Sequence, residues 1–167
     1  ERFTKALADK RITLAATDGN PIDTVWADRP APPQAQVTLQ PIELAGATPA
    51  EKLAAVQADL TKAGQDAVVL TAPDSIAWLF NIRGGDVSRT PLPLGRAFLF
   101  SDGQAELFLH PAKIGSELGQ HLGNEVTIRP SNELERRMAK LQGKRVSVDP
   151  ALASSWFFNA LTKAGIA

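Results

Sequence analysis

The sequence contains no cysteine, and its 167 residues include only two histidines. The missing cysteine excludes disulfides, thiolate nucleophiles and cysteine-ligated zinc, and it fits the reducing environment of the cytoplasm. No apolar run approaches the roughly 20 residues that span a bilayer, and the N-terminus lacks the hydrophobic stretch of a signal peptide. We therefore expect a cytoplasmic protein with no membrane partner.

An excess of charge of one sign is absent as well, because 18 lysine and arginine residues balance 18 aspartate and glutamate residues. A chain without a net positive field has little to attract nucleic acid or an anionic membrane, so we expect neither as a partner. With 44% hydrophobic and 22% charged residues, the composition is that of a globular protein. The length is sufficient for one well-packed domain.

The rest of the chain is organised around residues 66–86, DAVVLTAPDSIAWLFNIRGGD. The β-branched start of this stretch predicts a buried strand over residues 67–71. Pro73 then marks the start of a helix whose apolar residues 76–82 predict burial on nearly all sides. A glycine pair ends the helix. The exit loop carries several polar side chains, namely Asn81, Arg83, Asp86 and Arg89.

Turn and capping signals divide the remaining chain into alternating helices and strands. Thr48, Pro49 and Glu51 form the pattern of a capping box at a helix start. Asp102-Gly103 between two apolar runs predicts a β-hairpin. Further helices are predicted over residues 111–122, 131–142 and 151–164, and further strands over residues 125–129 and 144–149. This order predicts an α/β fold with three layers, α/β/α, and a mixed, largely parallel sheet of about five strands.

The three tryptophans have different expected environments. Trp78 and Trp156 fall on apolar helical segments and are expected in the core. Trp26 lies before residues 28–47, which are rich in proline and predict a linker or a strap lying across the domain surface. We expect Trp26 to pack against one of the two domains that flank the linker or to be exposed.

Three motifs carry a resemblance to one family. They are IAWLFNIRGGDVSRTPLPLGRAFLF over residues 76–100, NPIDTVW over residues 20–26 followed by Asp28-Arg29-Pro30, and IELAG over residues 42–46. In their order along the chain, they resemble the middle domain of the three-domain aminopeptidases P, the Xaa-Pro aminopeptidases. The resemblance covers essentially the whole chain.

The resemblance implies a fold and a domain organisation. The fold would be the ribonuclease-H-like one of the creatinase/prolidase N-terminal domains. Residues 1–27 would be the tail end of the first N-terminal domain, residues 28–47 the proline-rich linker or strap, and residues 48–167 the second creatinase-type domain. The chain is then expected to be a fragment that lacks the catalytic pita-bread domain.

The residues themselves predict no catalytic centre and no metal site. Neither His110 nor His121 lies in an H-E-x-x-H or other metal-ligand spacing, and no G-x-S-x-G elbow is present. The fold class raises the possibility of a two-magnesium nuclease. Its candidate carboxylates would be Asp66, Asp74, Asp86 and Asp149. Strand entry or helix starts explain most of these aspartates, and a neutral chain is poorly suited to a polyanion, so we discount a nuclease.

Asn81 and Arg83 are the candidate site residues. In one interpretation Arg83 pairs with Asp86, and the loop only caps a helix. In the other, which the resemblance implies, Asn81 and Arg83 contribute to the substrate cleft of the full-length enzyme or to an interdomain contact.

We predict a domain that is itself inactive and belongs to a metallo-aminopeptidase that removes N-terminal residues preceding proline. The resemblance implies two divalent metal ions, usually manganese, in the catalytic domain. It also implies that the partners are this catalytic domain and a second subunit, and that peptide substrate binds only to the full-length enzyme. The alternative is an independent α/β module that binds a small molecule or a protein.

Overall fold

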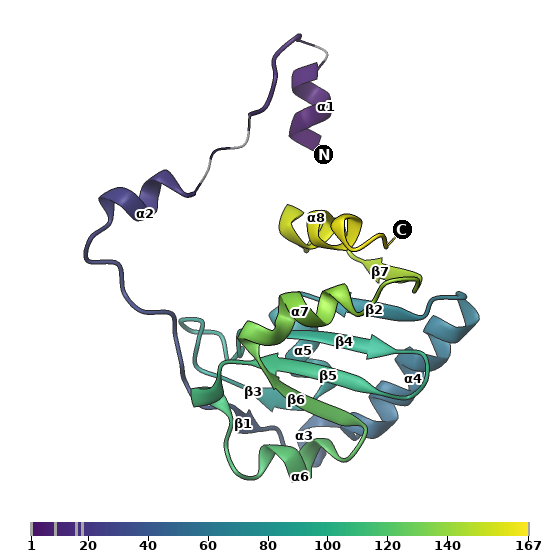
Figure 1. Cartoon of the computed structure of the whole chain (residues 1–167). Helices are drawn as coiled ribbons and strands as arrows, with labels where there is room; N and C mark the ends of the chain where they lie inside the picture. The colour runs from purple at the N-terminus through teal and green to yellow at the C-terminus, as the bar shows by residue number, and fades with distance from the viewer. Residues whose placement is uncertain (1, 9, 16, 18, 167) are drawn as a thin grey trace. The chain divides into compact units, whose positions relative to one another are not determined.

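The computed structural model describes residues 2–8, 10–15, 17 and 19–166 (Figure 1). Contacts between residues divide the chain into two units, Glu1–Pro32 and Pro33–Ala167. The first unit contains the helices α1 (Arg2–Ala8) and α2 (Pro21–Val25). No side chain described in this unit is buried, and Val25 is 82% exposed. Residues 1–32 therefore have no hydrophobic core of their own among the side chains described.

The second unit is built on a five-stranded sheet. Its strands are β2 (Ala67–Leu70), β4 (Arg96–Phe100), β5 (Ala105–Leu109), β6 (Val126–Pro130) and β7 (Val146–Val148), in the order β6-β5-β4-β2-β7. β4 runs antiparallel to both β2 and β5, whereas β5–β6 and β2–β7 are parallel pairs. The mixed five-stranded α/β fold is confirmed. The sheet is less parallel than predicted, because the hairpin strand β4 lies at its centre.

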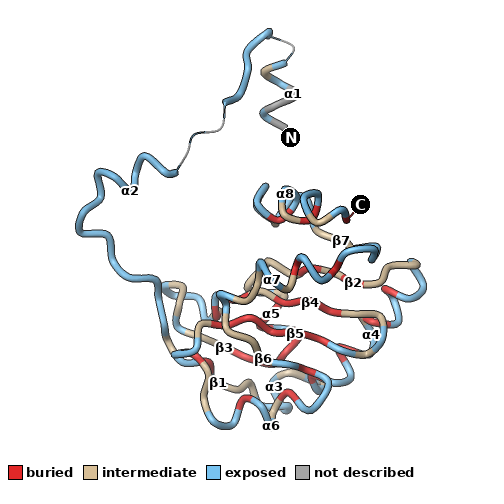
Figure 2. The backbone as a smooth tube through the Cα atoms, in the orientation of Figure 1, coloured by how far each residue is buried: buried red, intermediate tan, exposed pale blue. Residues whose placement is uncertain are grey.

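Helices cover both faces of the sheet (Figure 1). One face packs against α4 (Pro49–Lys62), α5 (Pro73–Leu79) and α6 (Leu118–Leu122), and the other packs against α7 (Leu134–Ala139) and α8 (Ser155–Lys163). Neighbouring residues of one strand alternate between the two cores, as Phe98 and Leu99 do. The central strands are consequently buried along most of their length (Figure 2).

The local capping and turn signals are confirmed. Thr48 Oγ1 accepts a hydrogen bond from Glu51 N at 3.2 Å, and Glu51 Oε2 accepts one from Thr48 N at 2.7 Å. The hydrogen bonds that the carboxylate accepts from the Thr48 backbone N–H and hydroxyl hold the pKa of Glu51 below its ordinary value. The Asp102-Gly103 turn joins β4 to β5, with Gly103 at φ +98°.

Three predicted helices are shorter than expected. The one predicted over residues 151–164 begins only at Ser155, as α8. Residues 111–122 form a 3-10 turn, Pro111–Lys113, and then α6, with Gly115 and Ser116 between them. Residues 131–142 form a 3-10 turn, Ser131–Glu133, before α7. In the segments 111–122 and 131–142, a 3-10 turn stands where the first turn of a continuous α-helix was predicted.

The predicted burial of Trp78 and Trp156 is wrong. Trp78 is 54% exposed and Trp156 is 41% exposed. On α5 the buried positions are Ile76, Ala77 and Leu79, and on α8 the buried neighbour of Trp156 is Phe157. Each helix lies on the outside of the sheet and buries one face only, so large apolar side chains on the other face stay exposed, namely Trp78 on α5 and Trp156 and Phe158 on α8.

Residues 33–47 belong to the second unit and pack against the rest of it. Val37 is buried, and its N–H donates to the Lys113 carbonyl at 2.9 Å. The strand β1 (Thr38–Leu39) pairs with β3 (Ile82–Arg83), the strand that follows α5. The short helix α3 (Ile42–Ala45) follows β1 in the chain. The pairing of β1 with β3 places a segment from the proline-rich region beside the loop that carries Asn81 and Arg83.

Candidate functional site

Asn81 lies inside the molecule, at the point where α5 gives way to β3. Its side chain is 2% exposed, and its backbone has φ +50°, a left-handed conformation that asparagine tolerates better than most residues. Oδ1 accepts a hydrogen bond from Lys52 Nζ at 2.6 Å, and Nδ2 donates to the Ala47 carbonyl at 2.8 Å. The Asn81 carbonyl also accepts from Gln40 N at 2.8 Å. Asn81 therefore joins α4, β3 and residues 40–47.

Lys52 brings a positive charge into this buried network. It is 6% exposed, and its Nζ also donates to the Trp78 carbonyl at 3.0 Å and lies 4.7 Å from the centre of the Trp78 ring. No ion pair of Lys52 occurs among the residues that the structure describes. Burial, and secondarily the charge of Arg83, lower the pKa of the Lys52 amine from its ordinary value. The amine is held by carbonyl, amide and ring groups only.

Arg83 is half-buried and caps the same helix. Its Nη1 donates to the Ala77 carbonyl at 3.3 Å and to its own neighbour, the Ile82 carbonyl, at 2.9 Å. Arg83 and Lys52 thus bind the carbonyls of Ala77 and Trp78 in the last turn of α5. Cations are favourable there because the C-terminal end of a helix carries partial negative charge.

Asp86 does not pair with Arg83, so that predicted pairing is wrong. Its carboxylate forms an ion pair with Lys113, and the two side chains are 0% and 4% exposed. Asp86 Oδ2 also accepts from Leu94 N at 2.6 Å, while Lys113 Nζ donates to the Leu94 carbonyl at 3.1 Å. Asp86 pairs with Lys113 because the 3-10 turn after β5 places the Lys113 amine beside it, whereas the Arg83 guanidinium binds the carbonyls at the end of α5.

The glycine between these residues is required by packing. A Cβ atom on Gly84 would lie 2.8 Å from Pro93 Cα, and Gly84 N donates to the Pro91 carbonyl at 3.2 Å. The two sides of the loop therefore touch backbone to backbone. Beyond this contact, Ser88, Arg89 and Thr90 form an exposed tip.

The other charged residues considered from the sequence do not converge. Asp66 accepts from Arg145 N at 2.7 Å, which lowers the pKa of its carboxyl, and Asp149 accepts from Ala151 N at 2.7 Å. Asp74 accepts from Ser75 N in the first turn of α5. With Asp86 tied to Lys113, these four aspartates have four separate structural roles.

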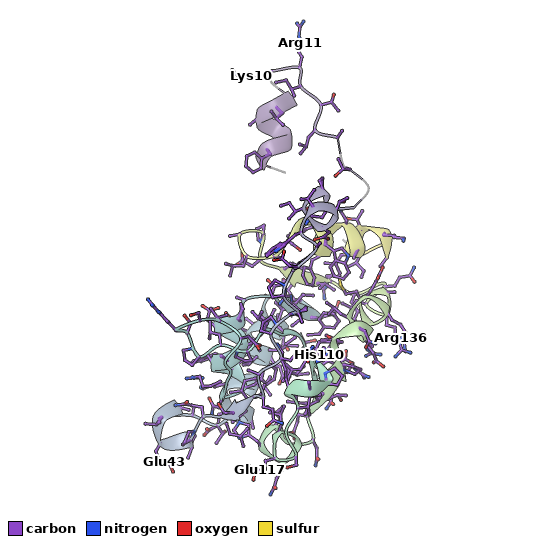
Figure 3. The ribbon with its side chains drawn as sticks, turned by 90° about the vertical axis from the view of Figure 1, so that its left-hand side faces the viewer. Lys10, Arg11, Glu43, His110, Glu117 and Arg136 are labelled. Carbon is purple, nitrogen blue, oxygen red and sulfur yellow. The ribbon has the colours of Figure 1, made fainter. Side chains whose placement is uncertain are left out.

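The histidines are also apart from one another. His121 Nε2 lies 2.9 Å from the Phe80 carbonyl, and His110 Nδ1 accepts from Ala112 N at 3.3 Å. His110 is well separated from Glu43 and Glu117 (Figure 3). Among the residues described, no three histidine, aspartate or glutamate side chains are grouped so that they could hold a metal ion. The donor set of the two metal ions implied by the resemblance does not fit this part of the chain.

Sequence reasoning missed Lys52 and Lys113, whose amines bind Asn81 and Asp86. A signal for Lys52 was present, because it falls at helical spacing between Pro49 and Val56 on the inner face of α4. Lys113 gave no local signal, since its partner lies 27 residues away.

A surface cavity of about 490 Å³ lies next to Asn81. The segments around residues 39–42, 48–50 and 121–125 complete its wall, and His121 is among them. No helix described in the chain has the length and apolar character needed to cross a membrane.

Comparison with known proteins identifies relatives of this region. Residues 28–166 match the family model described as the creatinase/prolidase N-terminal domain. A probable Xaa-Pro aminopeptidase P of Leptosphaeria maculans is 34% identical over 145 residues, covering 87% of this chain and 24% of that protein. One of Coccidioides posadasii is 38% identical over 119 residues, covering 71% and 18%. The chain thus spans about a quarter or less of the length of these relatives.

Solved structures agree with these matches. The X-prolyl aminopeptidase of Caenorhabditis elegans, described as a cytosolic enzyme with a di-nuclear active site, superposes with a TM-score of 0.79 at 25% identity. The match covers 87% of this chain and 25% of that one. A creatinase/prolidase-like N-terminal domain from Corynebacterium diphtheriae superposes with a TM-score of 0.51 at 18% identity, over 70% of this chain and 87% of that one, and shows the shared fold.

Proposed function

The chain belongs to the creatinase/prolidase N-terminal domain family, and we propose that it is a non-catalytic part of a longer, metal-dependent Xaa-Pro aminopeptidase. The observation that carries this proposal is the match to a small part of much longer aminopeptidases, at 34% identity over 87% of this chain. The described residues offer no metal-ligand cluster of their own, so the chemistry is assigned to the rest of the polypeptide.

In this proposal the full-length enzyme is cytoplasmic and hydrolyses the bond between an N-terminal residue and a following proline. Two divalent ions, manganese by family resemblance, would supply the activated water in the catalytic domain. Residues 1–27 would complete a preceding domain, residues 28–47 would be the linker or strap, and residues 48–167 would form the second domain. The absence of a core in residues 1–32 supports the first assignment, because exposed apolar residues there need a cover.

The part of this region in catalysis would be to shape substrate access and to hold the domains or subunits together. Of the two candidate residues, Arg83 would face the cleft or the interdomain contact, because only one of its guanidinium nitrogens has a partner in the described structure. Asn81 has both side-chain polar atoms satisfied internally and would act by holding the loop in place.

The test is steady-state kinetics of the full-length enzyme with an Xaa-Pro peptide and manganese. Arg83→Ala should lower kcat/KM by about tenfold, the effect of one lost charge-assisted hydrogen bond. Arg136→Ala is the matched control, since Arg136 lies on α7 across the sheet and pairs with Glu133. Unchanged kcat/KM in Arg83→Ala would remove Arg83 from the proposal. Metal-dependent turnover by the 167-residue chain alone would overturn the proposal that it is inactive.

The alternative function, an independent module that binds a small molecule, is favoured only by the cavity of about 490 Å³ beside Asn81. The reading frame beyond Ala167 separates the two functions. A stop codon there would favour the binding module, and a long continuation with spaced histidine, aspartate and glutamate residues would favour the aminopeptidase.

A further inference from the structure

We propose that Arg89, at the tip of the loop formed by residues 84–94, docks this domain onto a carboxylate side chain of the catalytic domain. The inference rests on the proposed function, in that it requires the polypeptide to continue into such a domain. It assigns the contact to a residue that lies outside the buried network of Asn81, Lys52 and Asp86.

The base of the loop is rigid. Asp86 receives hydrogen bonds from Lys113 and from Leu94 N, and the Lys113 amine also binds the Leu94 carbonyl. Gly84 packs directly on Pro93. A buried ion pair and a backbone-to-backbone contact therefore hold both ends of the loop, and the position of the tip is set by the core of the domain.

The tip is a tight turn with arginine in an unfavourable position. Val87 and Thr90 form an antiparallel bridge, and Thr90 N donates to the Val87 carbonyl at 3.2 Å. Between them Arg89 has φ +60°, where such turns normally carry glycine or asparagine. Glycine would adopt this φ without strain and would stabilise the isolated domain, so the stability of the domain does not account for an arginine at this position.

Arg89 has no partner within its own domain. Every other arginine side chain of residues 33–166 forms an ion pair with a carboxylate or donates a hydrogen bond to a carbonyl. Arg89 is exposed, and no hydrogen bond or ion pair of its side chain occurs within the same range. A guanidinium group presented in this way fits a carboxylate, which it can bind through two parallel hydrogen bonds.

A fixed protein carboxylate fits the geometry better than a peptide substrate does. Three cavities of residues 33–166, of about 460, 490 and 550 Å³, are lined by other segments: between α4 and α5, around Asn81, and between residues 36–39 and 115–118. A rigid, projecting tip outside these cavities suits a partner surface whose position is also fixed.

Hydrogen–deuterium exchange of the full-length protein tests the docking directly. The amides of residues 87–90 should exchange at least tenfold more slowly in the full-length protein than in the 167-residue chain. Arg89→Glu should abolish this protection and Arg89→Lys should keep part of it, whereas the control Arg136→Glu should leave it intact. Equal exchange in the two proteins, or full protection in Arg89→Glu, would overturn the inference.

Arg89→Gly provides a second measurement in which a folding defect cannot be mistaken for lost docking. It should raise the Tm of the 167-residue chain by about 2–4 °C, because it relieves the left-handed arginine. It should nevertheless remove the exchange protection in the full-length protein. Retained protection in this variant would contradict the docking role.

Kinetics separate this inference from the proposed function. Failure of the wild-type full-length protein to cleave Xaa-Pro peptides would refute the function, whatever the exchange data show. A raised KM in Arg89→Glu without any exchange protection in the wild type would mean that Arg89 binds substrate, and the docking inference would be wrong while the function stands.

Discussion

Two parts of the segment 81–94 differ sharply in how they use polar side chains. At residues 81–86, Asn81 and Asp86 are buried and bound to lysines, and Arg83 caps α5. At residues 88–90 the side chains are exposed, and Arg89 has no partner among residues 33–166. The comparison teaches that the residues which make the sequence motif recognisable mainly build the loop, whereas the residues that can meet a partner follow them.

The largest effect is expected from breaking the buried pair at the base of the loop. Lys113→Met leaves the Asp86 carboxylate buried without its cation and should lower the free energy of unfolding by about 3–5 kcal/mol. Urea unfolding followed by tryptophan fluorescence measures this loss. Lys140→Met, at an exposed position, should stay within about 0.5 kcal/mol of the wild type. Equal stability of the two variants would show that the pair does not hold the loop.

A smaller loss is expected at Asn81. Asn81→Ala removes the acceptor for Lys52 and the donor to Ala47, and it should lower the free energy of unfolding by roughly 2 kcal/mol. Asn81→Gly loses the same hydrogen bonds, but glycine adopts φ +50° without backbone strain, so this substitution should be less destabilising than Asn81→Ala. If glycine were the worse substitution, backbone strain would not contribute at this position.

The smallest effect is the pH dependence contributed by Lys52. The pKa of Lys52 is lower in the folded state than its ordinary value of 10.5, so between these two pKa values the unfolded chain binds more protons than the folded one. The free energy of unfolding should therefore rise with pH across this window. Lys52→Met should remove this rise. The measurement is urea unfolding of both proteins from pH 7 towards pH 10.5, at constant ionic strength. Parallel curves for the wild type and Lys52→Met would show that the Lys52 amine titrates as it does in the unfolded chain.

Short-range features of the fold could be read from the residues. The capping box at Thr48–Glu51 and the Asp102-Gly103 hairpin depend on hydrogen bonds between residues a few positions apart, so their patterns were sufficient. The burial of Trp78 and Trp156 could not be read in the same way. It depends on which side of α5 and α8 meets the sheet, and both helices are apolar on more than one side.

The sequence by itself determined the α/β class, the order of most elements and the family, because periodicity, caps and turns act within a few residues. The tertiary structure alone decided that Asn81 binds Lys52 across 29 residues of chain and that Asp86 binds Lys113 across 27. Those partners come from different helices and turns, which meet only when the sheet and its two helical layers have packed. Packing buries Asn81 and Asp86, and buried polar groups need hydrogen-bond partners, which the two lysines supply. Arg89 lies outside the packed region and faces solvent.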